Sequence, residues 1–299
     1  MRFEFVADRQ TKVKTFLKGH DISKALLAKI KFKGGSILVN GKEENAIYLL
    51  NIGDEVIIDI PDEKGHESLK PIKHELSIID EDEHFLVLNK PAGYASIPSI
   101  LHSNTMANFV KGYYQENNYP NQQIHIVTRL DKDTSGLMLF AKHGYAHARM
   151  DKQLQKRSIE KRYYALVSSS SKSKLAEKGE IIAPIARNDE SIITRCVHPS
   201  GKYAHTSYEV IEKYGDVYLV DIHLHTGRTH QIRVHFAHIG FPLLGDDLYG
   251  GNMNYGLKRQ ALHCHYLAFT DPFSKEHKQY NNPLTDDLDS VIIDLQNNR

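Results

Sequence analysis

The most informative part of the sequence is a polar stretch that leads into an apolar run, Thr128-Arg129-Leu130-Asp131-Lys132-Asp133-Thr134-Ser135-Gly136-Leu137. The apolar run over residues 136–141 predicts a buried strand. Asp131 stands between two cations, and a carboxylate near fixed positive charge stays ionised, which is the form that a nucleophile or proton acceptor needs. In the alternative interpretation, Asp131 or Asp133 only caps a turn, with neighbouring hydroxyl groups satisfying backbone groups.

Strand and helix patterns are mixed irregularly after about residue 74. Residues 85–89 predict a buried strand, and residues 163–167 and 217–224 are strand-like because they are rich in β-branched and aromatic side chains. Between them, apolar residues at helical spacing predict a helix that runs to about Arg157. This mixed order favours an α+β domain over a doubly wound parallel sheet.

The first sixty residues predict a small α+β module. A helix is expected over residues 22–32, with Asp21 as its N-cap. The pair Asn40-Gly41 predicts a tight hairpin turn, and a further strand is expected over residues 46–50. We therefore divide the chain into a small module (residues 1–60), a polar linker with Pro and Gly (residues 61–73) and a larger domain (residues 74–299).

The composition of the 299 residues is that of an ordinary globular protein, with 40% apolar residues and a net charge of +1. Uninterrupted apolar runs reach five residues, against about 20 for a membrane-spanning helix, so we expect no membrane span. Charged residues come too early at the N-terminus for a secretory signal. The two cysteines, Cys196 and Cys264, could form one disulfide at most, which cannot stabilise a fold of this size. We therefore expect the protein in the reducing cytoplasm.

Positive charge is concentrated near the N-terminus. Between Arg9 and Lys33 there are eight basic residues and one acidic residue. Such a patch favours contact with a polyanion, although a run of charge is usually just a solvated helix face. The lysines of this stretch that we consider for RNA binding are Lys12, Lys14, Lys18, Lys24, Lys29, Lys31 and Lys33.

A second segment is rich in His and Arg, Leu224-His225-Thr226-Gly227-Arg228-Thr229-His230-Gln231-Ile232-Arg233-Val234-His235. Its histidines suggest a metal site, but their spacing is not the i, i+4 pair of a zinc-protease helix and no Cys-x-x-Cys accompanies them. We therefore predict no metal. The forked guanidinium of Arg233 suits a carboxylate or phosphate. The segment Gly245-Asp246-Asp247-Leu248-Tyr249-Gly250 follows it.

Four motifs in this order resemble the RluA/RluD family of RNA pseudouridine synthases. They are Lys90-Pro91-Ala92-Gly93, the Arg129 to Gly136 stretch, the strand that starts Lys161-Arg162-Tyr163, and the His/Arg-rich segment. The residue before Arg129 is Thr128, where the family most often has His. The N-terminal module is similar to a small RNA-binding module named after a ribosomal small-subunit protein.

The resemblance implies a catalytic domain with a mixed, largely antiparallel central sheet, and the isomerisation of uridine in folded RNA. No redox step or group transfer is involved, so it implies no cofactor. Asp131 would be the essential carboxylate, acting on the sugar of an extruded nucleotide. Arg129 would fill the space left by the base, Tyr163 would stack on the uracil, and Arg233 would pair with Asp131.

Two other functions are weighed against this one. The first is a catalytically silent RNA-binding or ribosome-assembly factor on the same scaffold. The presence of all four motif residues, Arg129, Asp131, Tyr163 and Arg233, argues against a loss of catalysis. A glycoside hydrolase using Asp131 and Asp133 fits poorly, because residues two apart in an extended stretch face opposite sides. We expect RNA, ribosomal or transfer, as the partner, a monomeric state and a cytoplasmic location.

Overall fold

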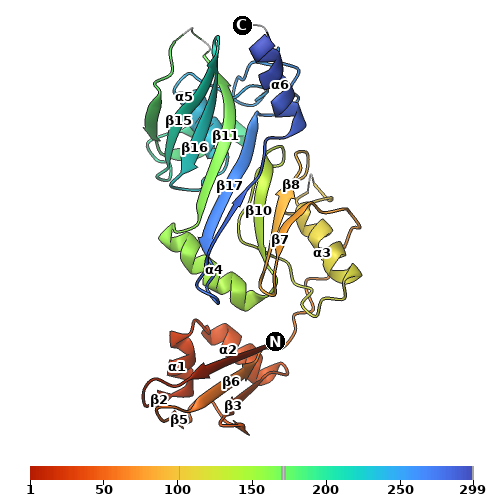
Figure 1. Ribbon diagram of the computed structural model, residues 1–299, viewed down its shortest axis with the longest axis vertical. Helices are drawn as coiled ribbons and strands as arrows, with labels where there is room; N and C mark the ends of the chain where they lie inside the picture. The colour runs from red at the N-terminus through yellow and green to blue at the C-terminus, as the bar shows by residue number, and fades with distance from the viewer. Residues whose placement is uncertain (101, 170, 172, 298–299) are drawn as a thin grey trace.

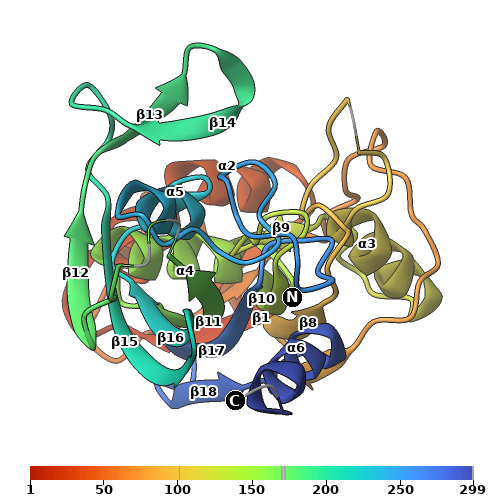
Figure 2. The same ribbon diagram turned by 90° about the horizontal axis from the view of Figure 1, so that it is seen from above.

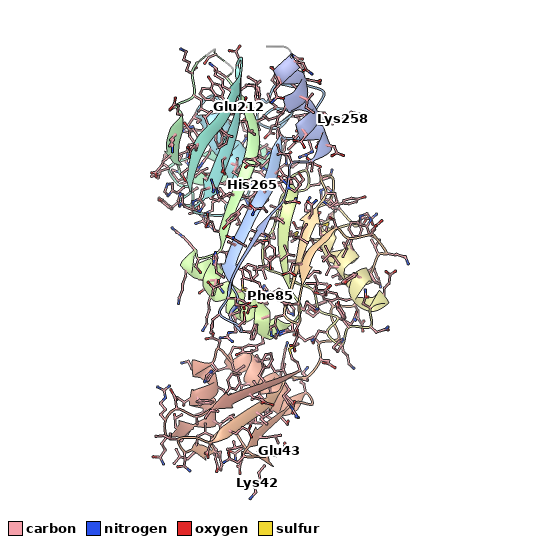
Figure 3. All side chains as sticks on the ribbon, in the orientation of Figure 1. Lys42, Glu43, Phe85, Glu212, Lys258 and His265 are labelled. Atoms are coloured by element: carbon pink, nitrogen blue, oxygen red, sulfur yellow. The ribbon has the colours of Figure 1, made fainter. Side chains whose placement is uncertain are left out.

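The computed structural model describes residues 1–100, 102–169, 171 and 173–297, so the last two residues of the expected large domain lie outside the described part. The molecule is elongated, with the N-terminal module at one end of the long axis and the larger domain above it (Figure 1). Lys42 and Glu43 of the module lie at the opposite end from Glu212 and Lys258 (Figure 3).

The N-terminal module is built from short strands and two helices. Its four-stranded sheet has the order β1-β6-β3-β4, and β2 pairs with β5 beside it. Its elements are β1 (Arg2–Val6), β2 (Thr11–Lys12), α1 (Val13–Gly19), α2 (Lys24–Phe32), β3 (Ser36–Val39), β4 (Lys42–Glu43), β5 (Leu49–Leu50) and β6 (Glu55–Asp59).

Two predictions about the module are corrected by the structure. Asp21 does not cap α2: its φ of 71° is left-handed, its carboxylate contacts Arg149 and Lys152 of the larger domain, and the Ser23 hydroxyl accepts the N–H of Leu26 instead. The strand expected over residues 46–50 shrinks to β5, because the pair Asn40-Gly41 turns the chain into β4 as the partner of β3.

The larger domain contains twelve described strands, of which ten form one sheet and the other two, β13 and β14, pair with each other in a separate sheet. Its strands are β7 (Ile78–Glu81), β8 (Phe85–Lys90), β9 (His125–Ile126), β10 (Ser135–Ala141), β11 (Glu160–Ser168), β12 (Lys178–Ile182), β13 (Ile185–Asn188), β14 (Ser191–Val197), β15 (His205–Tyr214), β16 (Val217–Leu224), β17 (Leu262–Thr270) and β18 (His277–Asn281). Its helices are α3 (Met106–Glu116), α4 (Gly144–Lys156), α5 (Gln231–His238) and α6 (Asp286–Asn297).

The central sheet runs β12-β15-β16-β11-β17-β10-β8-β7 and also includes β9 and β18. Its described pairs are antiparallel except β10 with β17, which confirms the predicted α+β class with a largely antiparallel sheet. Helices α4 and α5 cover one face through a cluster that includes Met150, Phe236 and Tyr163. Helices α3 and α6 cover the other face. Helix α2 lies on the α5 side of the molecule (Figure 2).

The segment that joins the two parts forms no named helix or strand from residue 60 to residue 77, but it is firmly held. The Glu63 carboxylate accepts hydrogen bonds from Lys29 of the module (3.0 Å) and from the backbone N–H of Gly144 at the start of α4 (2.9 Å), and it lies 2.8 Å from His125 Nε2. Lys111 of α3 donates to two carbonyl oxygens of the segment. The segment therefore packs against the larger domain through these hydrogen bonds.

Candidate active site

A groove with a volume of about 640 Å³ opens on the α5 face of the central sheet. Three stretches far apart in sequence line it: residues 127–134, the start of β11, and residues 224–233 leading into α5. These are three of the four motifs singled out from the sequence, and the fold gathers them into one groove, whereas Lys90-Pro91-Ala92-Gly93 does not line it in the described residues.

The described residues that line the groove include one acidic side chain, Asp131. Six basic residues line the same groove: Arg129, Lys132, Arg157, Lys161, Arg228 and Arg233. This imbalance suits a polyanion whose phosphates meet the cations while one group of the ligand meets the carboxylate.

Asp131 sits in a tight turn just before β10, in which the N–H of Thr134 bonds the Asp131 carbonyl at 3.2 Å. Its carboxylate is half-buried and makes no hydrogen bond or ion pair within the described part of the chain. Ser96 holds the start of the turn, because its hydroxyl both donates to the carbonyl and accepts from the N–H of Leu130. The backbone is fixed while the carboxylate stays available to a ligand.

Lys90 at the end of β8 anchors the rest of the turn. Its side chain is fully buried, and Nζ donates to the carbonyl oxygens of Pro91 (2.7 Å), Lys132 (2.9 Å) and Thr134 (2.8 Å). Three acceptors match the three N–H donors of an ammonium group. Burial lowers the Lys90 pKa to about 7, and the nearby charges of Asp133 and Asp131 limit that fall. The sequence showed this lysine only as part of a motif, without its role.

Arg233 does not pair with Asp131 as expected. Its guanidinium donates two hydrogen bonds of 2.7 Å to Asp246, in the loop after α5, and both side chains are buried. A buried cation requires a buried anion at good geometry, and Asp246 supplies it. Burial alone would lower the Arg233 pKa, but Asp246, with a smaller contribution from Asp131, raises it overall. Arg233 therefore acts on Asp131 through its charge.

Tyr163 is buried in β11 and lines the floor of the groove. A β-bulge at Arg162/Tyr163 shifts its pairing so that it lies opposite Cys264 of β17. Burial, reinforced by Cys264, raises the Tyr163 pKa well above its ordinary value, so the phenol stays protonated. Lys161 lines the same floor, and burial lowers its pKa.

The other polar residues of the stretch 128–134 differ in their exposure and in their partners. Arg129 is exposed at the mouth of the groove. Thr128 is buried and its hydroxyl accepts the backbone N–H of Leu139 at 2.9 Å, so it stabilises the start of β10. Asp133 does not line the groove in the described residues, and its carbonyl accepts a hydrogen bond from Arg259. Asp131 and Asp133 thus do not form a pair facing one substrate.

The histidines of the α5 segment have separate local partners. Buried His235 lies 2.9 Å from both the Thr206 hydroxyl and the Ala183 carbonyl, while His238 is exposed at the helix end. His230 lines the groove next to Tyr249. Among the described residues, no group of three or more His, Cys, Asp or Glu side chains is placed to hold a metal ion.

The N-terminal lysines are all exposed, and they lie at the end of β2, on α1, on α2 and at its C-cap. Lys29 differs from the others because its Nζ lies 3.0 Å from Glu63 in an ion pair. The aromatic ring of Phe32 is 77% exposed, and Lys31 lies over it at 5.0 Å. An exposed aromatic side chain among cations is typical of surfaces that bind nucleic acid.

Comparison with known proteins assigns this arrangement to a family. The family described as RNA pseudouridylate synthase matches residues 84–238. The RNA pseudouridine synthase YjbO of Bacillus subtilis is 42% identical over 94% of this chain and 98% of its own length. Ribosomal large subunit pseudouridine synthase D of Pseudomonas aeruginosa is 34% identical over 89% of this chain and 86% of its own. The solved structure of human RNA pseudouridylate synthase domain containing 1 has a TM-score of 0.58 and 26% identity, covering 74% of this chain and 95% of that one.

The chain therefore belongs to the RNA pseudouridine synthase family, as its resemblance to the RluA/RluD group implied. It is an isomerase that acts on uridine in RNA. No helix within the described residues is both long enough and apolar enough to cross a membrane.

Proposed function

We propose that the chain converts particular uridines of structured RNA into pseudouridine, with Asp131 as the essential carboxylate. The observation that carries the proposal is the lone acidic side chain among six cations in the groove. Lys and Arg neutralise backbone phosphates, so the groove suits RNA. The names of relatives that act on the ribosomal large subunit support ribosomal RNA as the substrate, with transfer RNA as the other substrate class.

The reaction needs a nucleotide taken out of its helix, at a cost of a few kcal/mol. Asp131 then either attacks the anomeric carbon or removes a sugar proton to give a glycal, and both routes use the ionised carboxylate. The bond from N1 of uracil to the anomeric carbon breaks, and the bond from C5 to that carbon forms. The C5 proton leaves and N1 gains a proton, so the product is an isomer and needs no cofactor.

Three side chains assist in this proposal. Arg129, exposed at the mouth, occupies the space that the extruded base leaves in the RNA. Tyr163, protonated and buried in the floor, stacks on the uracil. Arg233, fixed by Asp246, contributes a fixed positive charge to the groove that Asp131 lines.

The N-terminal module binds flanking RNA in this proposal. The chain then works as an RNA-binding module (residues 1–60), a linker (residues 61–73) and a catalytic domain (residues 74–299). Exposed lysines on α1 and α2 supply salt-dependent, largely sequence-independent affinity. The position of α2 on the α5 side of the molecule supports one RNA reaching both parts (Figure 2). We further propose that the protein acts as a monomer in the cytoplasm, where its two free cysteines stay reduced.

A comparative pseudouridine map tests the proposal and identifies the substrate. Ribosomal and transfer RNA from a strain lacking the gene and from its parent are mapped after carbodiimide treatment. We expect one or more pseudouridines to be missing in the deletion strain and restored by the wild-type gene. Identical maps would favour the catalytically silent RNA-binding factor instead.

A further inference from the structure

His230 is held in a costly backbone conformation at the edge of the groove. Its φ is 57°, in the left-handed region that a non-glycine residue rarely adopts, and it occupies the N-cap position of α5. Strain of this kind persists where the surroundings impose it, and it concentrates at binding and catalytic sites. The ring lines the groove, so the conformation places it where a ligand would lie.

Tyr249 determines which ring nitrogen of His230 carries the proton. The Tyr249 hydroxyl oxygen accepts the backbone N–H of Arg195 at 2.9 Å and lies 2.8 Å from His230 Nδ1. Within the described residues, Nδ1 is the acceptor that this hydroxyl can reach, and we assign the hydroxyl proton to that contact. Nδ1 is then the acceptor, and the neutral ring carries its proton on Nε2.

The Nε2–H group is left for a ligand. No residue in the described part of the chain forms a hydrogen bond with His230 Nε2. His230 and Asp131 line the same groove, and the charges of Asp131 and Arg233 both act on the ring. Burial lowers the His230 pKa, which keeps the imidazole neutral and its tautomer fixed. His230 therefore presents one oriented donor to the groove that Asp131 also lines.

We infer that His230 donates its Nε2–H to the 2′-hydroxyl of the extruded nucleotide and so selects ribose at the target position. The inference rests on the proposed function, in which Asp131 meets the anomeric carbon or its neighbour. The 2′-hydroxyl is attached to the carbon next to the anomeric carbon, so it enters the groove together with the reacting carbon, and His230 presents its donor in that groove. This hydroxyl is what lets a protein distinguish RNA from DNA at one position.

The test compares two synthetic stem-loops, both with the sequence that surrounds the target uridine in the RNA that the pseudouridine map identifies. One carries uridine at the target position and the other carries 2′-deoxyuridine. Wild-type protein is first assayed for pseudouridine in the uridine stem-loop, and absence of product would overturn the proposed function itself. Binding is then measured in an Asp131→Asn background, in which neither RNA changes during the measurement.

We expect the background protein to bind the uridine stem-loop about three- to tenfold more tightly than the deoxyuridine one, as for one neutral hydrogen bond. Adding His230→Asn should abolish this preference, because the Asn amide ends at the Nδ1 position, short of Nε2. Asn tolerates the left-handed backbone, so α5 still begins normally. His238→Ala, at the exposed end of the same helix, should keep the preference.

Two results would overturn the inference while leaving the proposed function intact. One is the absence of any preference in the background protein. The other is a preference that survives His230→Asn, including the case in which both RNAs bind more weakly by the same factor, because that marks a purely structural role.

Discussion

Arg233 donates two hydrogen bonds of 2.7 Å to Asp246 and none to Asp131, although the charges of both carboxylates act on its guanidinium. The two carboxylates therefore differ in their surroundings. Asp246 neutralises and orients the buried cation, while the Asp131 carboxylate, which has no hydrogen-bond partner among the described residues, is the one that meets the substrate in the proposed function. A direct bidentate pair between Arg233 and Asp131 would occupy those same oxygen atoms.

Asp246→Asn should destabilise the protein by about 3–5 kcal/mol, because it leaves the buried Arg233 guanidinium without its counter-ion. Urea unfolding followed by circular dichroism measures the loss. The neighbouring Asp247 is exposed, so Asp247→Asn is the matched control and should unfold like the wild type. A loss below about 1 kcal/mol in Asp246→Asn would show that this pair is not required to hold the site together.

Lys90→Met should lower kcat by about a hundredfold, because removing three anchors lets the Asp131 turn drift by about an ångström. Lys111 offers a matched control, since it is also buried and donates to two backbone carbonyls, but it is not among the described residues that line the groove. Lys111→Met should cost stability and leave kcat unchanged. Single-turnover kinetics on the identified RNA separates the two, and equal kcat values for both variants would contradict the anchoring role.

Glu63 should make stability depend on acid pH. Burial raises its pKa, but hydrogen bonds and charge from His125, with help from Lys29 and Gly144, outweigh that and hold the pKa at about 2, below its ordinary 4.5. A depressed carboxyl pKa adds stability above the unfolded-state pKa, and this stability is lost as pH falls from about 4.5 towards 2. Glu63→Gln should therefore cost on the order of 2 kcal/mol at pH 7 and almost nothing near pH 2.

The measurement is urea unfolding of the wild type and Glu63→Gln at several pH values between 2 and 7. A difference between the two proteins that stays constant across this range would mean that the carboxylate charge of Glu63 is not what joins the linker to α4.

The lysines of α2 and its C-cap residue, Lys33, should control how RNA affinity responds to salt. Replacing Lys24, Lys31 and Lys33 by Gln should make the slope of log K against log salt shallower by about 0.7–0.9 for each lost phosphate contact. A control with the same change in charge replaces Lys42, Lys174 and Lys258, which are exposed elsewhere. Filter binding in 50–300 mM salt compares them, and an identical slope in both triple variants would exclude α2 as an RNA contact.

Turns and buried strands could be predicted from short sequence patterns, because a few neighbouring residues determine them. The pair Asn40-Gly41 marked a real turn, and the apolar run after Asp131 became the buried strand β10. The cap of α2 was misassigned because Asp21 and Ser23 are both good N-caps, and contacts of Asp21 with Arg149 and Lys152 across the two parts of the molecule decided between them.

The partners inside the site depend on the tertiary fold and were not predictable in the same way. Asp246 stood unassigned in its Gly-rich segment, because nothing local indicates which acidic residue will be buried with Arg233. Lys90 reaches the carbonyls of Lys132 and Thr134 only once β8 pairs with β10. His230 was one of several histidines until its φ and its bond to Tyr249 distinguished it.

The most direct test of the account is the product that purified Asp131→Asn and Asp133→Asn proteins form on the identified RNA. After complete nuclease digestion, liquid chromatography with mass spectrometry separates uridine, pseudouridine and free uracil. We predict no pseudouridine with Asp131→Asn, near wild-type pseudouridine with Asp133→Asn, and no free uracil from either. Pseudouridine formed by Asp131→Asn at the wild-type rate, or uracil released by the wild type, would contradict the account.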